Sequence, residues 1–222
     1  MAELFLVRHG QASFGSDNYD CLSALGERQG EWLGEYFAQR GIEFDRFLTG
    51  SMQRHEQTLA AISRGLGRPL PCEVHPGLNE YDFRALYRAL GEEHHELRAL
   101  ASGSMADFYR GLKEVLRLWS EDRIAGPVPE TWAQFQQRVA AAGDTIRLGS
   151  GRKVLAVSSG GAIGVMTQQI LRAPAATAIA LNMQLRNSSI SHYFFNSASI
   201  QMASFNSLPH LDPIRLDAIT YG

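Results

Sequence analysis

Two polar motifs in this chain each follow a short apolar run of the kind that forms a buried strand. Arg8-His9-Gly10 comes directly after residues 4–7, and Ser158-Ser159-Gly160-Gly161 comes directly after residues 154–157. A histidine at the end of a buried strand is held by a rigid scaffold. Here a permanent cation precedes it and a glycine that permits close backbone approach follows it. This motif alone does not distinguish a functional His9 from a purely structural one that caps the end of the strand through a hydrogen bond.

The chemistry that these residue types favour is the local binding of a small anion. Arginine stays charged at any working pH and forks onto two oxygens of a phosphate, and backbone N–H groups at a helix start can also bind an anion. The chain as a whole carries 23 acidic and 21 basic residues, a net charge of -2. This balance offers no general attraction for nucleic acid or an anionic membrane, so any anion must be held by a local site.

The elements that position these motifs are predicted to form one α/β domain over residues 1–222. With 45% apolar and 20% charged residues, the composition is that of an ordinary globular protein and excludes disorder, collagen and coiled coil. Apolar patterns predict strands at 4–7, 47–49, 154–157, 189–195 and 199–205, and helices at 23–40, 51–64, 83–123 and 130–148, with another ending near 172. This alternation predicts a three-layer α/β/α fold with a mostly parallel central sheet. Ligands of such sheets bind beyond the carboxyl ends of strands, where both motifs lie.

Several segments, in the correct order, resemble the motifs of the histidine phosphatase superfamily, also called the phosphoglycerate mutase-like family. The resemblance covers nearly the whole chain. The segments are LVRHGQ at 6–11, CLSALGERQ at 21–29, SMQRHEQT at 51–58, GLNE at 77–80 and the helix at 132–139. We therefore expect the phosphoglycerate mutase-like fold, with a helical insertion at about 81–129 that caps the pocket.

The resemblance also implies site residues. It makes His9 the residue that becomes phosphorylated, Arg8 and Arg54 the phosphate-binding cations, and Glu80 the acid catalyst. It implies no metal and no cofactor, and the sequence shows no metal-ligand spacing. For its role, Glu80 needs a raised pKa, which burial would supply.

One motif departs from the family pattern. After the strand at 154–157 the family usually has Ser-His-Gly, its second active-site histidine, whereas this chain has Ser159 at that position. Ser159 can donate a hydrogen bond to phosphate, as can the Gly160 backbone, but it supplies no positive charge. Either activity is reduced or another group compensates, and the candidates are His192 and Arg84.

The expected function is hydrolysis of a small phosphate monoester through a phosphohistidine on His9, with Glu80 as general acid and base. Two alternatives stay open. One is a low-activity or inactive member that binds phosphate or a phosphoprotein, and the other is a phosphoglycerate mutase-type phosphotransferase. The presence of both His9 and Glu80 favours catalysis over binding alone. The residues after the acid, 81–83, lack the fuller match expected of a mutase.

The expected partner is a small phosphorylated molecule. Nucleic acid and membrane are not expected as partners, and a homodimer is left open. In the insertion, cationic or titratable side chains that could select an anionic substrate are Arg84, Arg88, His94 and His95. Whether the loop residues Gln11, Ser13 or Asn18 touch the ligand is also left open.

The remaining chemistry-bearing residues receive structural interpretations. His55 follows Arg54 on a helix and points about 100° away from it, which favours a surface position. Cys21 and Cys72 are too few for a disulfide framework, so both are predicted to be reduced packing residues. The N-terminal segment lacks the basic region of a signal peptide, and no apolar run nears the length of about 18 residues that a membrane span needs. We therefore expect a cytoplasmic protein.

Overall fold

The two apolar strands beside the polar motifs, β1 and β4, form the centre of a six-stranded sheet. The computed structural model describes residues 1–13, 20–211 and 214–221. Its strands are β1 (Ala2–Arg8), β2 (Arg46–Thr49), β3 (Glu73–Val74), β4 (Lys153–Ser158), β5 (Ile190–Phe195) and β6 (Ile200–Ser207). Their order across the sheet is β3-β2-β4-β1-β5-β6.

The sheet is mixed, with a parallel half and an antiparallel edge. β1 pairs in parallel with β4, β4 with β2, and β2 with β3. β5 pairs antiparallel with β1, and β6 with β5. The predicted mostly parallel sheet and the hairpin at the end of the chain are both confirmed.

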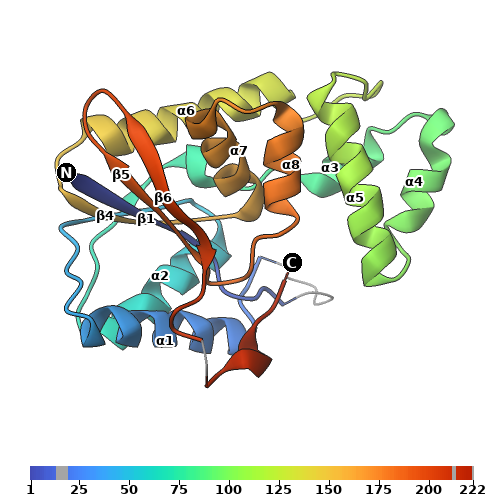
Figure 1. Cartoon of the computed structure of the whole chain (residues 1–222). Helices are drawn as coiled ribbons and strands as arrows, with labels where there is room; N and C mark the ends of the chain where they lie inside the picture. The colour runs from blue at the N-terminus through green and yellow to red at the C-terminus, as the bar shows by residue number, and fades with distance from the viewer. Residues whose placement is uncertain (14–19, 212–213, 222) are drawn as a thin grey trace.

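Helices cover both faces of this sheet. They are α1 (Ala24–Gln39), α2 (Gln53–Leu66), α3 (Phe83–Arg88), α4 (His95–Leu100), α5 (Met105–Ser120), α6 (Trp132–Leu148), α7 (Gly160–Leu171) and α8 (Ala175–Asn182), with short 3-10 turns η1 (Pro76–Leu78), η2 (Glu92–His94) and η3 (Leu216–Ala218). Figure 1 shows α1 and α2 on one side of the sheet and α6 and α7 on the other, which is the predicted three-layer architecture.

The alternation of side chains along the central strand builds two separate cores. Leu4 and Leu6 of β1 point toward α6 and α7, where they join a cluster that contains Phe135. Val7 joins the opposite cluster with Leu33 of α1 and with residues of α2. Because successive strand residues face opposite sides, burial on both faces gives the continuous apolar run that marks β1 in the sequence.

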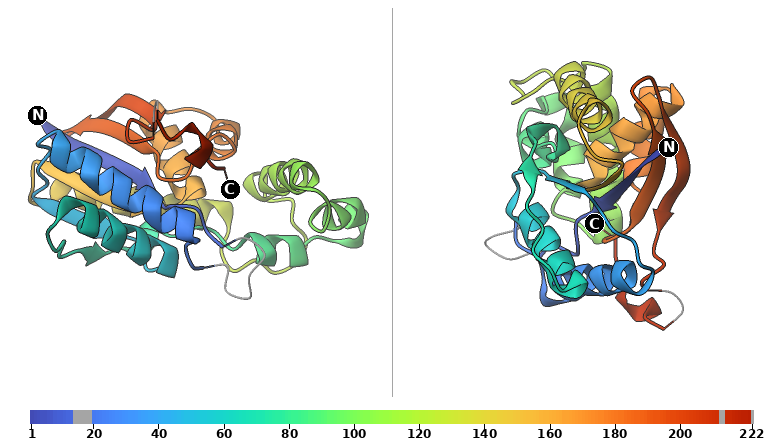
Figure 2. Two further views of the ribbon diagram at one scale, coloured as in Figure 1. Left: turned by 90° about the horizontal axis from the view of Figure 1, so that it is seen from below. Right: turned by 90° about the vertical axis from the view of Figure 1, so that its left-hand side faces the viewer.

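The helices of residues 83–120 lie beyond one end of the sheet rather than over its faces. Figures 1 and 2 show α3, α4 and α5 beside the three-layer body. Helix α5 begins with a capping box in which Ser104 and Asp107 satisfy each other's backbone N–H groups. Its apolar face, including Leu112, Leu116 and Trp119, is buried as the helical spacing predicts.

Two smaller expectations have different outcomes. Cys72 is exposed, so its predicted packing role is wrong, because the residue precedes the short edge strand β3 and not a core element; Cys21 is half-buried. Among the described residues, we find no helix that is both long and apolar enough to cross a membrane.

The start of α1 is packed directly against the loop that follows β1. A Cβ added at Gly26 would lie 2.1 Å from the Gln11 carbonyl oxygen, and one added at Gly10 would lie 2.3 Å from the Gly26 carbonyl oxygen. Ser23 caps the helix by accepting a hydrogen bond from the Gly26 N–H at 3.0 Å. These close backbone approaches require glycine at both positions, and they anchor the residues next to His9.

We therefore predict that Gly26→Ala lowers the free energy of unfolding by about 1–3 kcal/mol, because a methyl group must be accommodated against backbone. The matched control is Gly143→Ala in α6, where an added Cβ would meet no atom within 4 Å. This control should raise stability by about 0.5–1 kcal/mol through helix propensity. Urea unfolding of both variants tests the prediction, and equal effects would contradict it.

Candidate active site

The two polar motifs meet at the carboxyl edge of the sheet. Because β1 and β4 run parallel, Arg8 lies opposite Ser158 in the register. The His9 backbone N–H then donates to the Ser158 carbonyl at 2.9 Å. The third segment arrives on β2, which also pairs with β4, so that Arg54 in the first turn of α2 reaches the same edge.

His9 is held as a neutral imidazole of defined orientation. Its Nδ1 lies 2.7 Å from the Gly10 carbonyl oxygen, which can only accept, so Nδ1 carries the proton. The Nε2 atom accepts a hydrogen bond from Arg54 Nε at 3.2 Å. Burial, and then the nearby charges of Arg54 and Arg8, hold the pKa of His9 well below its ordinary value. An unprotonated Nε2 is the nucleophilic form of histidine, and its lone pair here accepts the hydrogen bond from Arg54.

Arg54 is buried and is oriented by several partners. Besides His9 Nε2, its Nη1 forms an ion pair with Asp20 Oδ1 at 2.8 Å. The other Asp20 oxygen accepts from the Gln53 backbone N–H at 2.9 Å, which caps the start of α2. Asp20 was not singled out from the sequence, because an isolated acid in a loop carries no pattern. Only the fold brings it to the arginine.

Arg8 stands beside this pair at the end of β1. Only 8% of the residue is exposed, and its Nη1 donates to the Leu185 carbonyl, which fixes the guanidinium at the wall of the site. Two buried guanidinium groups next to one imidazole place fixed positive charge at one point of a chain of net charge -2. Such a site matches a dianion such as a phosphoryl group.

Glu80 reaches the site from the segment after η1. Its Oε2 accepts from the Gly161 backbone N–H at 3.0 Å and its Oε1 from the Tyr81 N–H at 3.2 Å. Burial raises the pKa of Glu80, against the opposing effects of the Gly161 hydrogen bond and of Arg54 and Arg8. A Cβ at position 161 would lie 2.2 Å from Glu80 Oε1, so glycine there makes room for the carboxyl group.

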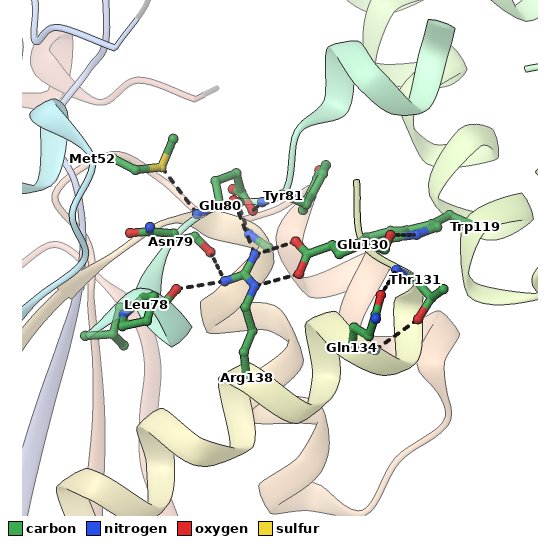
Figure 3. Close-up of polar contacts among 12 residues, drawn as sticks. Met52, Leu78, Asn79, Glu80, Tyr81, Trp119, Glu130, Thr131, Gln134 and Arg138 are labelled. Carbon is green, nitrogen blue, oxygen red and sulfur yellow. Dashed lines mark hydrogen bonds and ion pairs between the residues drawn. The ribbon is translucent and has the colours of Figure 1, made fainter. Parts of the chain in front are cut away.

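The segment that carries Glu80 is held by Arg138 of α6 (Figure 3). Its Nη1 donates to the Asn79 carbonyl at 2.8 Å, and its Nη2 donates to the Glu80 carbonyl at 3.3 Å. A bidentate ion pair with Glu130, at 2.7 and 2.8 Å, orients the guanidinium. Arg138 thus positions the acid from a helix more than fifty residues further along the chain. The family motifs mark the helix at 132–139, but no local pattern in the sequence distinguishes Arg138.

Ser159 is fully buried at the start of α7, and its neighbour is His55. The Ser159 hydroxyl lies 2.6 Å from His55 Nε2 and 3.5 Å from Arg54 Nη2. The predicted surface position of His55 is wrong, since its exposed fraction is 0%. The helical step does turn His55 away from Arg54. However, α2 begins against the sheet edge, so the step directs the ring toward the end of β4 instead of toward solvent.

A cavity of about 460 Å³ opens over these residues. Its lining includes Arg8, His9, Arg54 and Glu80, all expected from the sequence, whereas the expected Ser159 and Gly160 are not among the described lining residues. Much of its wall comes from α3, α5 and the segments around α8 and Tyr221. This part includes the apolar or aromatic residues Tyr81, Phe83, Phe108, Tyr109, Leu112, Met183, Leu185 and Tyr221. The helices of residues 83–120 therefore form one side of the site.

The two candidates for compensating the missing histidine have opposite outcomes. Arg84 of α3 lines the cavity. His192 does not reach it, because it lies opposite Phe5 in the middle of the sheet, and its Nε2 contacts Glu3 Oε2 at 3.0 Å. His192 is therefore wrong as a compensating group. The other candidates in the insertion, Arg88, His94 and His95, are not among the described residues that line the cavity.

The loop after His9 makes contacts of its own. Gln11 Oε1 accepts from the Ser23 hydroxyl at 2.8 Å, and the Ser13 hydroxyl donates to the Leu22 carbonyl at 3.0 Å. Neither is among the described residues that line the cavity. Asn18 lies outside the described residues. No group of three or more His, Cys, Asp or Glu side chains that could hold a metal ion occurs within the part of the chain that the structure describes.

Comparison with known proteins gives a match to one family model over most of the chain. Residues 4–208 match the model of the histidine phosphatase superfamily (branch 1). No curated protein matches the chain significantly.

Solved structures with the same fold include three phosphatases of low sequence identity. The alpha-ribazole phosphatase from Shigella flexneri is 21% identical, with 93% of this chain and 96% of that chain covered and a TM-score of 0.65. The phosphoserine phosphatase from Entamoeba histolytica is 19% identical, with coverages of 95% and 100% and a TM-score of 0.65. The mycobacterial glucosyl-3-phosphoglycerate phosphatase is 19% identical, with coverages of 93% and 99% and a TM-score of 0.64.

The site geometry predicts the protonation state of His9. At pH 7, NMR of the imidazole nitrogens should show a neutral ring with the proton on Nδ1, because burial and two arginines oppose the cation. Arg54→Met should raise the pKa of His9, since it removes the nearest positive charge. A protonated His9 at pH 7, or a proton on Nε2 of the neutral ring, would contradict the geometry.

A second prediction concerns Arg138. Arg138→Lys should lower the free energy of unfolding by about 1.5–3 kcal/mol, because lysine cannot reproduce the fork to Glu130 and the loop carbonyls. The matched control is Arg147→Lys on the same helix, whose partner Asp144 has a side chain that is 62% exposed. Exposed pairs contribute about 0–1 kcal/mol. Equal losses in chemical denaturation would show that Arg138 does not hold the Glu80 segment.

Proposed function

This chain belongs to the histidine phosphatase superfamily (branch 1), and from that premise we propose that it hydrolyses phosphate monoesters through a phosphohistidine on His9. The observation that carries the proposal is the state of the imidazole: Nδ1 is bonded to the Gly10 carbonyl while Nε2 faces Arg54 in the cavity. A site that only bound phosphate would gain more from a protonated, cationic histidine. The neutral ring supports catalysis over the binding-only alternative.

In the first step, the lone pair of His9 Nε2 attacks phosphorus and the bond to the ester oxygen breaks. Arg54 and Arg8 bind the equatorial oxygens of the phosphoryl group and stabilise the charge of the transition state. Ser159 and the Gly160 N–H, at the start of α7, are proposed as further hydrogen-bond donors to the same oxygens. The arginines supply the positive charge in this scheme, so the proposal requires no metal.

Glu80 is the proposed general acid and base. Burial raises its pKa, which is the direction that a general acid needs. In its protonated form the carboxyl group gives its proton to the leaving oxygen, so that the product departs as an alcohol. The resulting carboxylate then takes a proton from water as the water oxygen attacks phosphorus. This attack breaks the bond to Nε2, releases inorganic phosphate and restores both His9 and the protonated Glu80.

The cavity supports a proposal for the substrate class. Its volume of about 460 Å³ greatly exceeds that of a phosphate ion, and its outer wall is rich in aromatic and aliphatic side chains. We propose a small phosphorylated metabolite whose organic part packs against Phe83, Phe108 and Tyr109. The names of the structural neighbours, alpha-ribazole phosphatase, phosphoserine phosphatase and glucosyl-3-phosphoglycerate phosphatase, support a small phosphate ester as the substrate.

The direct test is hydrolysis of an aryl phosphate in the presence of a chelator. Wild-type protein should turn over, and His9→Ala should lose activity to background because the nucleophile is absent. His75→Ala removes a histidine that is not among the described residues lining the cavity and whose Nδ1 accepts from the Gly77 N–H at 3.0 Å, and it should retain the activity. Wild-type turnover by His9→Ala would refute the mechanism.

The role of Glu80 predicts a dependence on the leaving group. Glu80→Gln should lower kcat by about 100- to 10,000-fold with an alkyl phosphate, because the alkoxide needs a proton. The loss in the first step should be much smaller with a nitrophenyl phosphate, whose anion leaves unprotonated. Burst kinetics separate this step from hydrolysis of the phosphoenzyme. Equal losses of the burst rate with both esters would exclude Glu80 as the acid.

A further inference from the structure

The contact between His55 and Ser159 is unused by the mechanism above. Both residues are fully buried, and neither is among the described residues that line the cavity. They nevertheless lie directly behind the phosphate-binding groups. The His55 ring centroid is 5.7 Å from that of His9, and the Ser159 hydroxyl connects His55 to Arg54 with distances of 2.6 and 3.5 Å.

The hydrogen-bond directions in this group can be assigned. Arg54 can only donate, so the Ser159 oxygen accepts from it. Burial and the Arg54 charge lower the pKa of His55 to about 3, so its ring is neutral at neutral pH. Within the described structure, His55 Nδ1 has no partner. A buried N–H without an acceptor is more costly than a ring nitrogen without a donor, so the proton belongs on Nε2.

With the proton on Nε2, His55 donates to the Ser159 oxygen, which then accepts from both His55 and Arg54. The proton of the Ser159 hydroxyl is left to point away from both donors. His9 Nε2 lies 3.2 Å from Arg54 Nε, so an oxygen of a phosphoryl group carried by His9 would be a suitable acceptor for this proton. A hydroxyl that accepts hydrogen bonds from two donors is itself a stronger donor.

We propose that His55 is a positioning residue that acts through Ser159: it fixes the hydroxyl so that Ser159 and Arg54 together donate to the phosphoryl group on His9. This inference rests on the proposed function. His55 would then be the group that supports Ser159, the serine that stands where the family usually has its second active-site histidine. The imidazole is supplied from the first turn of α2 instead of from the end of β4.

The packing of His55 supports the idea that its imidazole takes the place of a histidine side chain at position 159. The ring lies against the backbone of Gly50, where an added Cβ would be 2.3 Å from Nδ1. On its other side, Nε2 is within 2.6 Å of Ser159 Oγ. A histidine side chain at position 159 that extended in the direction of its present hydroxyl contact would therefore overlap the His55 ring. The site has room for one imidazole there and not for two.

The exchange is tested by moving the imidazole back. Ser159→His should lower kcat with an aryl phosphate by about 10- to 100-fold because the two rings collide, and His55→Ala should lower it similarly because the hydroxyl loses its donor. The double variant His55→Ala/Ser159→His should recover kcat to within about 5-fold of wild type. A folded double variant as impaired as its worse single parent would overturn the proposal.

A second comparison separates positioning from packing. The side-chain amide of His55→Gln can place a donor near the original Nε2, whereas that of His55→Asn can reach only the region of Nδ1. Glutamine should retain kcat within about 5-fold and asparagine should lose about 10- to 100-fold, with KM changed much less than kcat. The matched control is His192→Gln, a half-buried histidine that contacts Glu3 and should behave as wild type.

These variants also decide the case in which the double variant does not fold. Equal kcat values for folded His55→Gln, His55→Asn and wild type would refute a role for His55. Failure of the proposed function looks different, because wild type would then be inactive or His9→Ala would be active. Thermal unfolding of each variant excludes loss of structure as the cause.

Discussion

The site depends on the parallel pairing of β1 with β4. The hydrogen bond from the His9 N–H to the Ser158 carbonyl, 2.9 Å long, joins the ends of these strands. It brings His9 next to the start of α7. The Ser158 hydroxyl in turn donates to the Leu78 carbonyl at 2.7 Å, which draws in the segment that carries Glu80. With β2 on the other side of β4, the same edge also receives Arg54. Three segments distant in sequence therefore converge because of strand order.

Burial then gives the titratable groups of the site their chemical states. Removal from water disfavours charge, so it lowers the pKa of His9 and raises that of Glu80. The two buried arginines resist this effect because guanidinium stays charged at any accessible pH. The result is a neutral imidazole, a carboxyl group with a raised pKa, and two fixed cations around one space. The fixed charge is suited to a phosphoryl group, and the neutral groups are suited to attack and proton transfer.

The sequence predicted the parts of this arrangement that leave a local pattern. Continuous apolar runs marked β1 and β4, helical spacing marked α1 and α5, and the family motifs identified His9, Arg54 and Glu80. It did not predict the roles of Asp20, Arg138 and His55, because each depends on how distant elements pack. For His55, the helical geometry alone was misleading. A side chain turned about 100° from Arg54 is exposed only if solvent lies in that direction, and here the end of β4 lies there instead. One sequence signal could have linked the two residues: the chain lacks a histidine at position 159 and has one at position 55, next to Arg54.

The central claim of this account is that His9 Nε2 forms a covalent bond to phosphorus. The most direct measurement is rapid acid-free quenching of the wild-type protein during turnover of a radiolabelled phosphate ester, followed by mass spectrometry of its peptides. The account predicts label on His9, stable to base and lost in acid, with the phosphoryl group on Nε2. Turnover without label on His9, or with label on another residue, would contradict it.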